Sequence, residues 1–345
     1  MSEHPTSVGK YDLEQFLGGG MSHVYRAKDR VLGRRVALKL LTEQGAADDE
    51  TKARFLQEAR MASNINHENI ISVYDFGEEQ GRPFIVMEFL EGESLRDALR
   101  SGHLGDFQSR IEICLQIGRA LDYIHARKII HRDIKPENIH IDGEGKPRLM
   151  DFGIAKTEGV QLTRAGFTLG TPYYMAPEQV LAKPLTPQAD IYAFGILLFE
   201  LLTGAKPLAG GTVERIFDQI LYEPLNLEPL AAAGVPAAVS DLISSCTAKD
   251  PTMRPQTFGP ICEELSRFID AAPTAHQPGI RPRIRPEKKR PPAAVREDRP
   301  SGLPSFFDKL PPRLRTQGGL MFLAGSAVVV VLLVLYGILA LAHVV

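Results

Sequence analysis

Short apolar runs alternate with polar turns along the first part of the chain, which is the pattern of β-strands. Residues 36–41 and 84–87 are two such runs. Between them, residues 49–63 carry helix formers, with apolar residues on one side and acidic residues near the start. The pattern predicts a small, strand-rich part over residues 11–89 that contains one helix.

The next part of the chain has the periodicity of helices. Apolar or small residues recur there at three- and four-residue spacing: Ile111, Leu115, Gly118, Leu121 and Ile124. This spacing predicts a helix with one buried face. Residues 190–202 are almost wholly apolar, which predicts a helix in the centre of a larger, helical lobe.

The last part of the chain changes in composition. Residues 271–318 are rich in Pro and Arg and cannot bury enough apolar surface to fold alone, so we interpret them as a linker. Residues 320–342 contain no Asp, Glu, Lys or Arg and are long enough to span a bilayer. A buried core helix is the alternative, although such helices seldom run this long without a charge. Arg313 and Arg315 precede the run and favour a cytoplasmic side for everything before it.

The composition is that of an ordinary globular protein, with 44% hydrophobic and 24% charged residues and a net charge of −2. Residues 281–315 are basic, but the apolar run that follows favours an anionic membrane surface over nucleic acid as their partner. The three cysteines lie far apart without metal-ligand spacing, which predicts free thiols: Cys114, Cys246 and Cys262. The first nine residues are polar and predict no signal peptide.

The chemistry is concentrated in an eight-residue block that ends at Asn138 and reads His-Arg-Asp-Ile-Lys-Pro-Glu-Asn. In this block Asp133 can accept a hydroxyl proton, and Lys135 can neutralise a phosphoryl group. Asn138 and, after a predicted hairpin over residues 139–150, Asp151 offer the oxygen ligands that Mg²⁺ prefers. Catalysis of phosphoryl transfer is mostly positioning and charge neutralisation, and these groups supply both.

A glycine-rich turn is the candidate phosphate-binding loop, because residues without a β-carbon let backbone N–H groups approach phosphates. Its members are Leu17, Gly18, Gly19, Gly20, Met21, Ser22, His23 and Val24. A triple glycine also forms simple hairpins, so the turn alone leaves both readings open. One strand later comes Lys39, and Glu58 lies in the middle of the predicted helix. Such a pair can hold an ammonium against the α- and β-phosphates.

These motifs, with Asp151-Phe152-Gly153 and Ala176-Pro177-Glu178, resemble a eukaryotic-type (Hanks-type) Ser/Thr protein kinase of the kind that bacteria anchor in their membranes. The resemblance covers residues 11–269. It implies an α+β, bilobal fold with a small β-rich N-lobe (residues 11–89) and a larger α-helical C-lobe (residues 90–269), followed here by the linker and one transmembrane helix. Lys135 and Gly170-Thr171-Pro172 resemble the Ser/Thr branch of the family rather than the Tyr branch.

The same resemblance assigns roles to further residues. Asp190 is expected to support the catalytic loop, and Glu178 to form an ion pair with Arg254. The residues expected at adenine are Met87 as the gatekeeper, with Glu88 and Leu90 in the hinge. The cofactors implied are ATP and Mg²⁺, with Mn²⁺ as the alternative ion.

The glycine-rich turn departs from the family pattern. It is one residue shorter than the usual G-x-G-x-x-G, and Ser22 stands where the third glycine is expected, which puts its cover over the phosphates in doubt.

Arg132 is available to pair with a phosphorylated loop residue. This loop is the segment between Gly153 and Ala176. Thr157 lies in it, and by resemblance Thr171 contacts substrate. Our candidates for autophosphorylation are Thr163 and Thr168.

We expect an enzyme that phosphorylates protein Ser/Thr hydroxyls at the inner or plasma membrane, as a single-pass protein with a cytoplasmic kinase domain. A homodimer would serve autophosphorylation in trans, and we expect no nucleic-acid partner and no extracellular sensor domain. Two alternatives are a pseudokinase scaffold and a small-molecule kinase of similar fold. The first usually lacks Lys39, Asp133 or Asp151, and the second has no need of Ala176-Pro177-Glu178.

Overall fold

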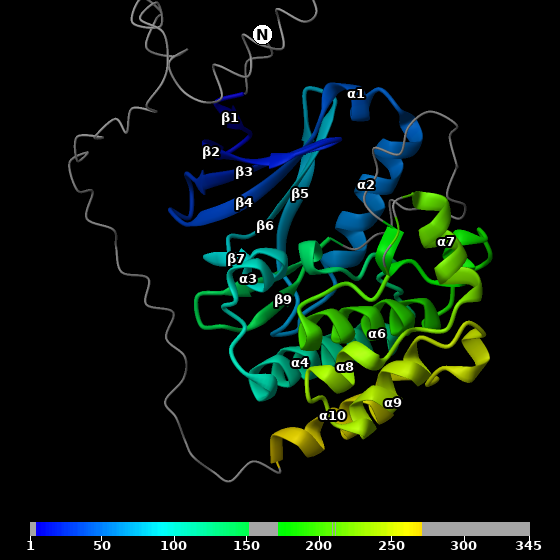
Figure 1. Ribbon diagram of the computed structural model, residues 1–345. Coiled ribbons are helices and arrows are strands. Elements are labelled where there is room, and N and C mark those ends of the chain that lie inside the picture. The colour runs from blue at the N-terminus through cyan, green and yellow to red at the C-terminus, as the bar shows by residue number, and fades with distance from the viewer. Residues whose placement is uncertain (1–4, 152–171, 209, 211, 271–345) are drawn as a thin grey trace, which may run out of the picture. The chain divides into compact units, whose positions relative to one another are not determined.

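The computed structural model describes residues 5–151, 172–208, 210 and 212–270 (Figure 1). Within these ranges no helix is long and apolar enough to cross a membrane. The predicted linker and the predicted span lie outside the described residues. So do Phe152 and Gly153, and four threonines: Thr157, Thr163, Thr168 and Thr171.

The N-lobe is an antiparallel sheet of six strands within the described residues, in the order β1-β2-β3-β4-β6-β5. The strands are β1 (Ser7–Val8), β2 (Tyr11–Gly19), β3 (Ser22–Asp29), β4 (Arg35–Leu41), β5 (Val73–Glu79) and β6 (Arg82–Glu88). Two helices follow β4: α1 (Glu43–Ala46) and α2 (Asp49–Ala62). The predicted strands at β4 and β6 and the predicted helix at α2 are confirmed, but the sequence reading missed the short α1.

The side chains of β4 explain how the sheet and α2 pack together. Val36, Leu38 and Leu40 lie in an apolar cluster with residues of β3 and β6. Leu41 instead contacts the α2 face, where it joins a cluster with Phe55. Because side chains alternate along a strand, Lys39 points to the α2 face of the sheet as well.

The C-lobe begins with β7 (Gly92–Ser94), α3 (Leu95–Ser101) and α4 (Phe107–His125). The catalytic loop then leads to η1 (Pro136–Asn138), β8 (Ile139–Asp142) and β9 (Pro147–Leu149). The remaining elements are η3 (Pro172–Tyr174), α5 (Pro177–Val180), α6 (Gln188–Thr203), α7 (Val213–Tyr222), α8 (Glu228–Ala232), α9 (Ala237–Cys246), η4 (Pro251–Met253) and α10 (Phe258–Asp270). The helix expected near residue 111, the central helix and the hairpin are all confirmed.

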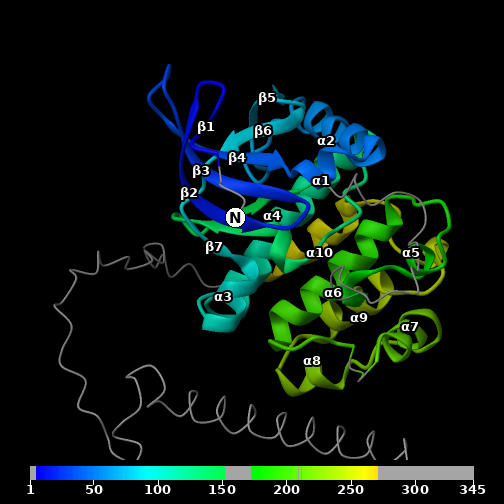
Figure 2. The ribbon, with the colours of Figure 1, turned by 90° about the horizontal axis from the view of Figure 1, so that it is seen from above.

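Helix α6 is the centre of this lobe, because every residue from Ala189 to Leu202 is buried. It packs against α4, α8 and α9 (Figure 2). The predicted free cysteines are present as such, with Cys114 and Cys246 buried and Cys262 half-buried.

The two lobes meet beside β9. The amide of Leu149 donates to the Asn69 carbonyl at 2.8 Å, and the amide of Ile71 donates to the Leu149 carbonyl at 3.0 Å. This backbone pairing fixes the end of β9 against the segment that follows α2. It therefore brings Asp151, two residues beyond Leu149, close to Lys39 in the sheet.

Candidate active site

A buried carboxylate on α6 holds the backbone of the catalytic loop. Asp190 accepts hydrogen bonds from the amides of His131 at 2.7 Å and Arg132 at 2.8 Å, and His125 Nε2 lies 2.8 Å from the same carboxylate. Arg132 has a φ of +68°, a conformation that costs a non-glycine residue free energy. The bonds to Asp190 offset that cost, and the predicted support of the loop is confirmed.

Two further contacts fix the same stretch. Gln179 Nε2 donates to the Arg132 carbonyl at 3.0 Å. His131 Nε2 lies 3.1 Å from the Met150 carbonyl. Burial lowers the pKa of the His131 imidazole, so the neutral ring is favoured, and its Nε2–H donates to Met150. The loop thus reaches the pocket already shaped.

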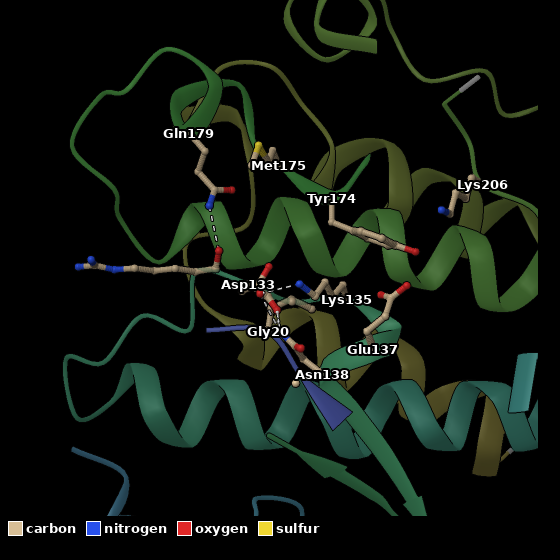
Figure 3. A pocket seen from close by; sticks show the side chains of 12 residues that line it. Gly20, Asp133, Lys135, Glu137, Asn138, Tyr174, Met175, Gln179 and Lys206 are labelled. Atoms are coloured by element: carbon tan, nitrogen blue, oxygen red, sulfur yellow. Dashed lines mark hydrogen bonds and ion pairs between the residues drawn. The ribbon is translucent and has the colours of Figure 1, made fainter. Parts of the chain in front are cut away.

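The reactive groups of the loop converge on Asp133. Lys135 Nζ lies 2.8 Å from Asp133 Oδ2, and Asn138 Nδ2 donates to that oxygen at 2.9 Å and to the Asp133 carbonyl at 2.8 Å (Figure 3). They line a cavity of about 770 Å³ together with Gly19, Gly20, Arg132, Ile134, Glu137, Tyr174, Met175, Gln179 and Lys206. A carboxylate that opens on such a cavity can accept the proton of an incoming hydroxyl.

Lys39 connects three elements of the site. Its ammonium lies 3.2 Å from Glu58 Oε1 on α2 and 2.8 Å from Asp151 Oδ1 beyond β9. Burial opposes the charge on Lys39, but the two carboxylates outweigh it and raise the pKa of the lysine. The ammonium in turn lowers the pKa of Asp151, whereas burial raises the pKa of Glu58. The predicted pair of Lys39 and Glu58 is present, and Asp151 joins it.

The donor atoms of Asn138 and Asp151 fit a hard divalent cation. The Asn138 side-chain amide donates both of its hydrogen bonds to Asp133. This leaves Asn138 Oδ1 as the atom that can bind a metal ion. Asp151 stays ionised because of Lys39, and 46% of its side chain is exposed. Two protein oxygens with water and phosphate oxygens are the usual environment of Mg²⁺. Within the described residues no cluster of three or more His, Cys, Asp or Glu could hold a metal by itself.

The glycine-rich turn joins β2 to β3 and reaches the same cavity through Gly19 and Gly20. Gly18 and Gly19 have φ values of +134° and +143°, and a β-carbon on Gly19 would lie 1.9 Å from the Ser22 carbonyl oxygen. Only glycine fits there. Val24 pairs with Gly18 across the turn, and the exposed Leu17 precedes it in β2.

The expected hinge begins at the end of β6. Met87 and Glu88 are the last two residues of this strand and pair with Ala37 and Val36 of β4, respectively. Leu90 lies just beyond the strand. The Glu88 carboxylate binds the guanidinium of Arg148 on β9. This pair could not be predicted from the sequence, because its members lie in different lobes.

Sequence reasoning also missed a cluster centred on Arg96 of α3. Its guanidinium lies 2.8 Å from Glu137 and 2.6 Å from Glu200, and it donates to the Tyr174 hydroxyl at 2.6 Å. Glu137 and Tyr174 line the cavity, so Arg96 braces the wall on which an acceptor would lie.

The expected ion pair below this wall is confirmed. Arg254 donates to the two carboxylate oxygens of Glu178 at 2.7 and 2.9 Å, and both side chains are buried. The pair fixes α5, which carries Gln179 and thereby contacts the catalytic loop.

Comparison with known proteins gives a consistent result. A family model described as "Protein kinase domain" matches residues 11–265. The chain is 38% identical over 265 residues to the serine/threonine-protein kinase PrkC of Bacillus subtilis, a match that covers 76% of this chain and 41% of PrkC. It is 37% identical over 308 residues to the serine/threonine-protein kinase PknA of Mycobacterium tuberculosis, which covers 87% of this chain and 68% of PknA. This chain therefore spans less than half of PrkC but about two thirds of PknA.

Proposed function

Because this chain belongs to the protein kinase family and its relatives are serine/threonine-protein kinases, we propose that it transfers the γ-phosphoryl group of ATP to Ser or Thr hydroxyls of proteins. The observation that carries the proposal is the convergence of Asp133, Lys135 and Asn138 on one cavity with Gly19 and Gly20. A phosphate acceptor and a phosphate donor can meet in that space.

In this mechanism each residue acts from its observed position. Asp133 accepts the proton of the acceptor hydroxyl, and Lys135 beside it neutralises the transferring group. Lys39 binds the α- and β-phosphates and is held by Glu58. Asn138 Oδ1 and the Asp151 carboxylate would hold Mg²⁺, which would supply charge neutralisation on the phosphates.

The test is transfer of label from γ-labelled ATP with Mg²⁺ to a mixture of casein and a basic protein, followed by identification of the labelled amino acid. We expect phosphoserine or phosphothreonine from the wild type and at least about 100-fold less from Asp133→Asn. Asp241→Asn, an exposed acid on α9, is the matched control and should act as wild type.

The alternatives predict different results. A pseudokinase scaffold would bind ATP and label nothing, and a small-molecule kinase would label neither the added proteins nor itself. Label on tyrosine would contradict the proposal directly.

Regulation and location rest on the sequence alone. We propose autophosphorylation of Thr163 or Thr168 in trans, in a homodimer that is anchored in the inner or plasma membrane by residues 320–342. Loss of Thr163 and Thr168 together should remove self-labelling and lower turnover. A chain truncated after Asp270 should leave the membrane fraction of cells and label itself more slowly. If the truncated chain stayed in the membrane fraction, the anchor would be contradicted. If the chain without both threonines kept its activity, the autophosphorylation sites would be contradicted.

A further inference from the structure

The tip of the glycine-rich turn is fastened by a residue that does not line the cavity. The Met21 carbonyl accepts two hydrogen bonds from Thr42, one from its amide at 3.0 Å and one from its Oγ1 at 2.9 Å. Thr42 follows β4 directly and lies just before α1. The turn is thus tied to the junction of a strand and a helix.

The hydroxyl of Thr42 both donates and accepts a hydrogen bond. Oγ1 donates to the Met21 carbonyl and accepts from the Gly45 amide at 3.1 Å, so that Thr42 also caps the N-terminus of α1. A hydroxyl has one donor hydrogen and accepts as well, so one geometry serves both bonds. A β-carbon at Gly45 would lie 3.1 Å from the Met21 oxygen, which shows how closely that carbonyl packs against α1.

Two other residues of the turn lie at the cavity. Gly19 and Gly20 line the cavity with Asp133 and Lys135. Gly20 and Met21 are the only residues between β2 and β3, so a displacement of the Met21 carbonyl moves Gly20 with it. The glycines have no side chains with which to anchor the turn, and 56% of the Met21 residue is exposed.

We propose that Thr42 is a positioning residue that clamps the glycine-rich turn through the Met21 carbonyl, holds Gly20 over the cavity, and so sets the affinity for the phosphates of ATP. This inference rests on the proposed function, since it assumes that the cavity takes ATP. It also answers the doubt raised by the shortened turn, because a shorter turn that is tied at its tip can still cover the phosphates.

A purely structural role would be different. If Thr42 only capped α1, its loss would lower thermal stability and leave ligand affinity unchanged. If it clamps the turn, its loss weakens binding of ligands with phosphates more than binding of the nucleoside.

The experiment uses the full chain and three variants. Thr42→Val keeps the shape of the side chain and loses the hydroxyl, and Thr42→Ser keeps the hydroxyl. Thr212→Val is the matched control, because Thr212 caps α7 through the Arg215 amide and lies outside the turn. Dissociation constants for Mg²⁺·ATP and for adenosine are measured by calorimetry, with the KM for ATP, kcat and Tm beside them.

For Thr42→Val we expect the Kd and KM for ATP to rise about fivefold, the scale of one net hydrogen bond, with the adenosine Kd within about twofold. Thr42→Ser should restore the wild-type values, and Thr212→Val should lower Tm without changing the ATP Kd. Equal ATP Kd values for wild type and Thr42→Val, or equal losses for ATP and adenosine, would overturn the inference. A wild-type chain that bound no ATP would overturn the proposed function and the clamp with it.

Discussion

The catalytic loop and the glycine-rich turn lie on two sides of one cavity, but different kinds of contact hold them. The loop rests on Asp190, a buried carboxylate carried by the most buried helix of the C-lobe. The turn is tied by Thr42 at a strand end, and the nearby Lys39 shares its charge with the half-exposed Asp151. The groups that meet the acceptor are therefore supported by the core, whereas those that meet ATP are held by hydrogen bonds at a strand end and by an ion pair with a half-exposed partner.

The strongest test of the core support is Arg254→Met, which leaves the buried Glu178 carboxylate without its partner. Breaking a buried pair in this way lowers the free energy of unfolding by about 4 kcal/mol. Urea denaturation measures the loss. The control is Arg267→Met, which removes an exposed pair with Glu264 and should change stability by less than about 1 kcal/mol. A small loss for Arg254→Met would mean that the C-lobe does not depend on this pair.

The second test is Asp190→Asn, which presents an amide group where the backbone donors of His131 and Arg132 need acceptors. We expect a loss of about 3 kcal/mol in unfolding free energy, since hydrogen bonds to a charged group are lost. Turnover should fall about 100-fold as well, because the catalytic loop is misplaced. Unfolding free energy and turnover are measured on one preparation. A fall in turnover without a loss of stability would contradict the link between loop and core.

The nucleotide side should respond differently. Lys39→Met is expected to lower kcat/KM about 100-fold, equal to about 2.7 kcal/mol, because a charge on the phosphates is lost. Unfolding free energy should fall by less than for Arg254→Met, because solvent screens the exposed end of the pair with Asp151 and burial already favours the neutral form of Glu58, the other partner. That contribution is present at neutral pH and is lost as the pH falls through the lowered pKa of Asp151. A large stability loss at pH 7 would remove the contrast between the two sides.

The smallest effect is expected at the hinge. Glu88→Gln weakens the contact with Arg148 that joins β6 to β9, and we expect the adenosine Kd to rise about twofold to threefold. Glu91→Gln is the control, because Glu91 is exposed and its ion pair with Arg35 is long, at 4.0 Å. Calorimetry with adenosine measures the Kd of both variants. Identical Kd values would show that the pair of Glu88 and Arg148 does not affect adenosine binding.

The sequence predicted much of the fold where the signal is local. The strand at β4, the amphipathic α2 and the wholly apolar α6 each carry their own periodicity, and the catalytic block is contiguous. What it missed depends on distant partners. Arg96 reads as a surface charge on a short helix until folding brings Glu200 to it, and Arg148 has no neighbour in sequence that announces Glu88. Thr42 was missed with α1, because a four-residue helix is too short for periodicity to show.

The carboxylate of Asp190 has a consequence for hydrogen exchange. The catalytic loop is irregular backbone at the surface of a cavity, where amide protons usually exchange with water through local opening. The amides of His131 and Arg132 instead donate to a side chain rooted in α6. A bond to a buried carboxylate opposes local opening of the loop, so these two amides should exchange more slowly than the other amides of the catalytic loop.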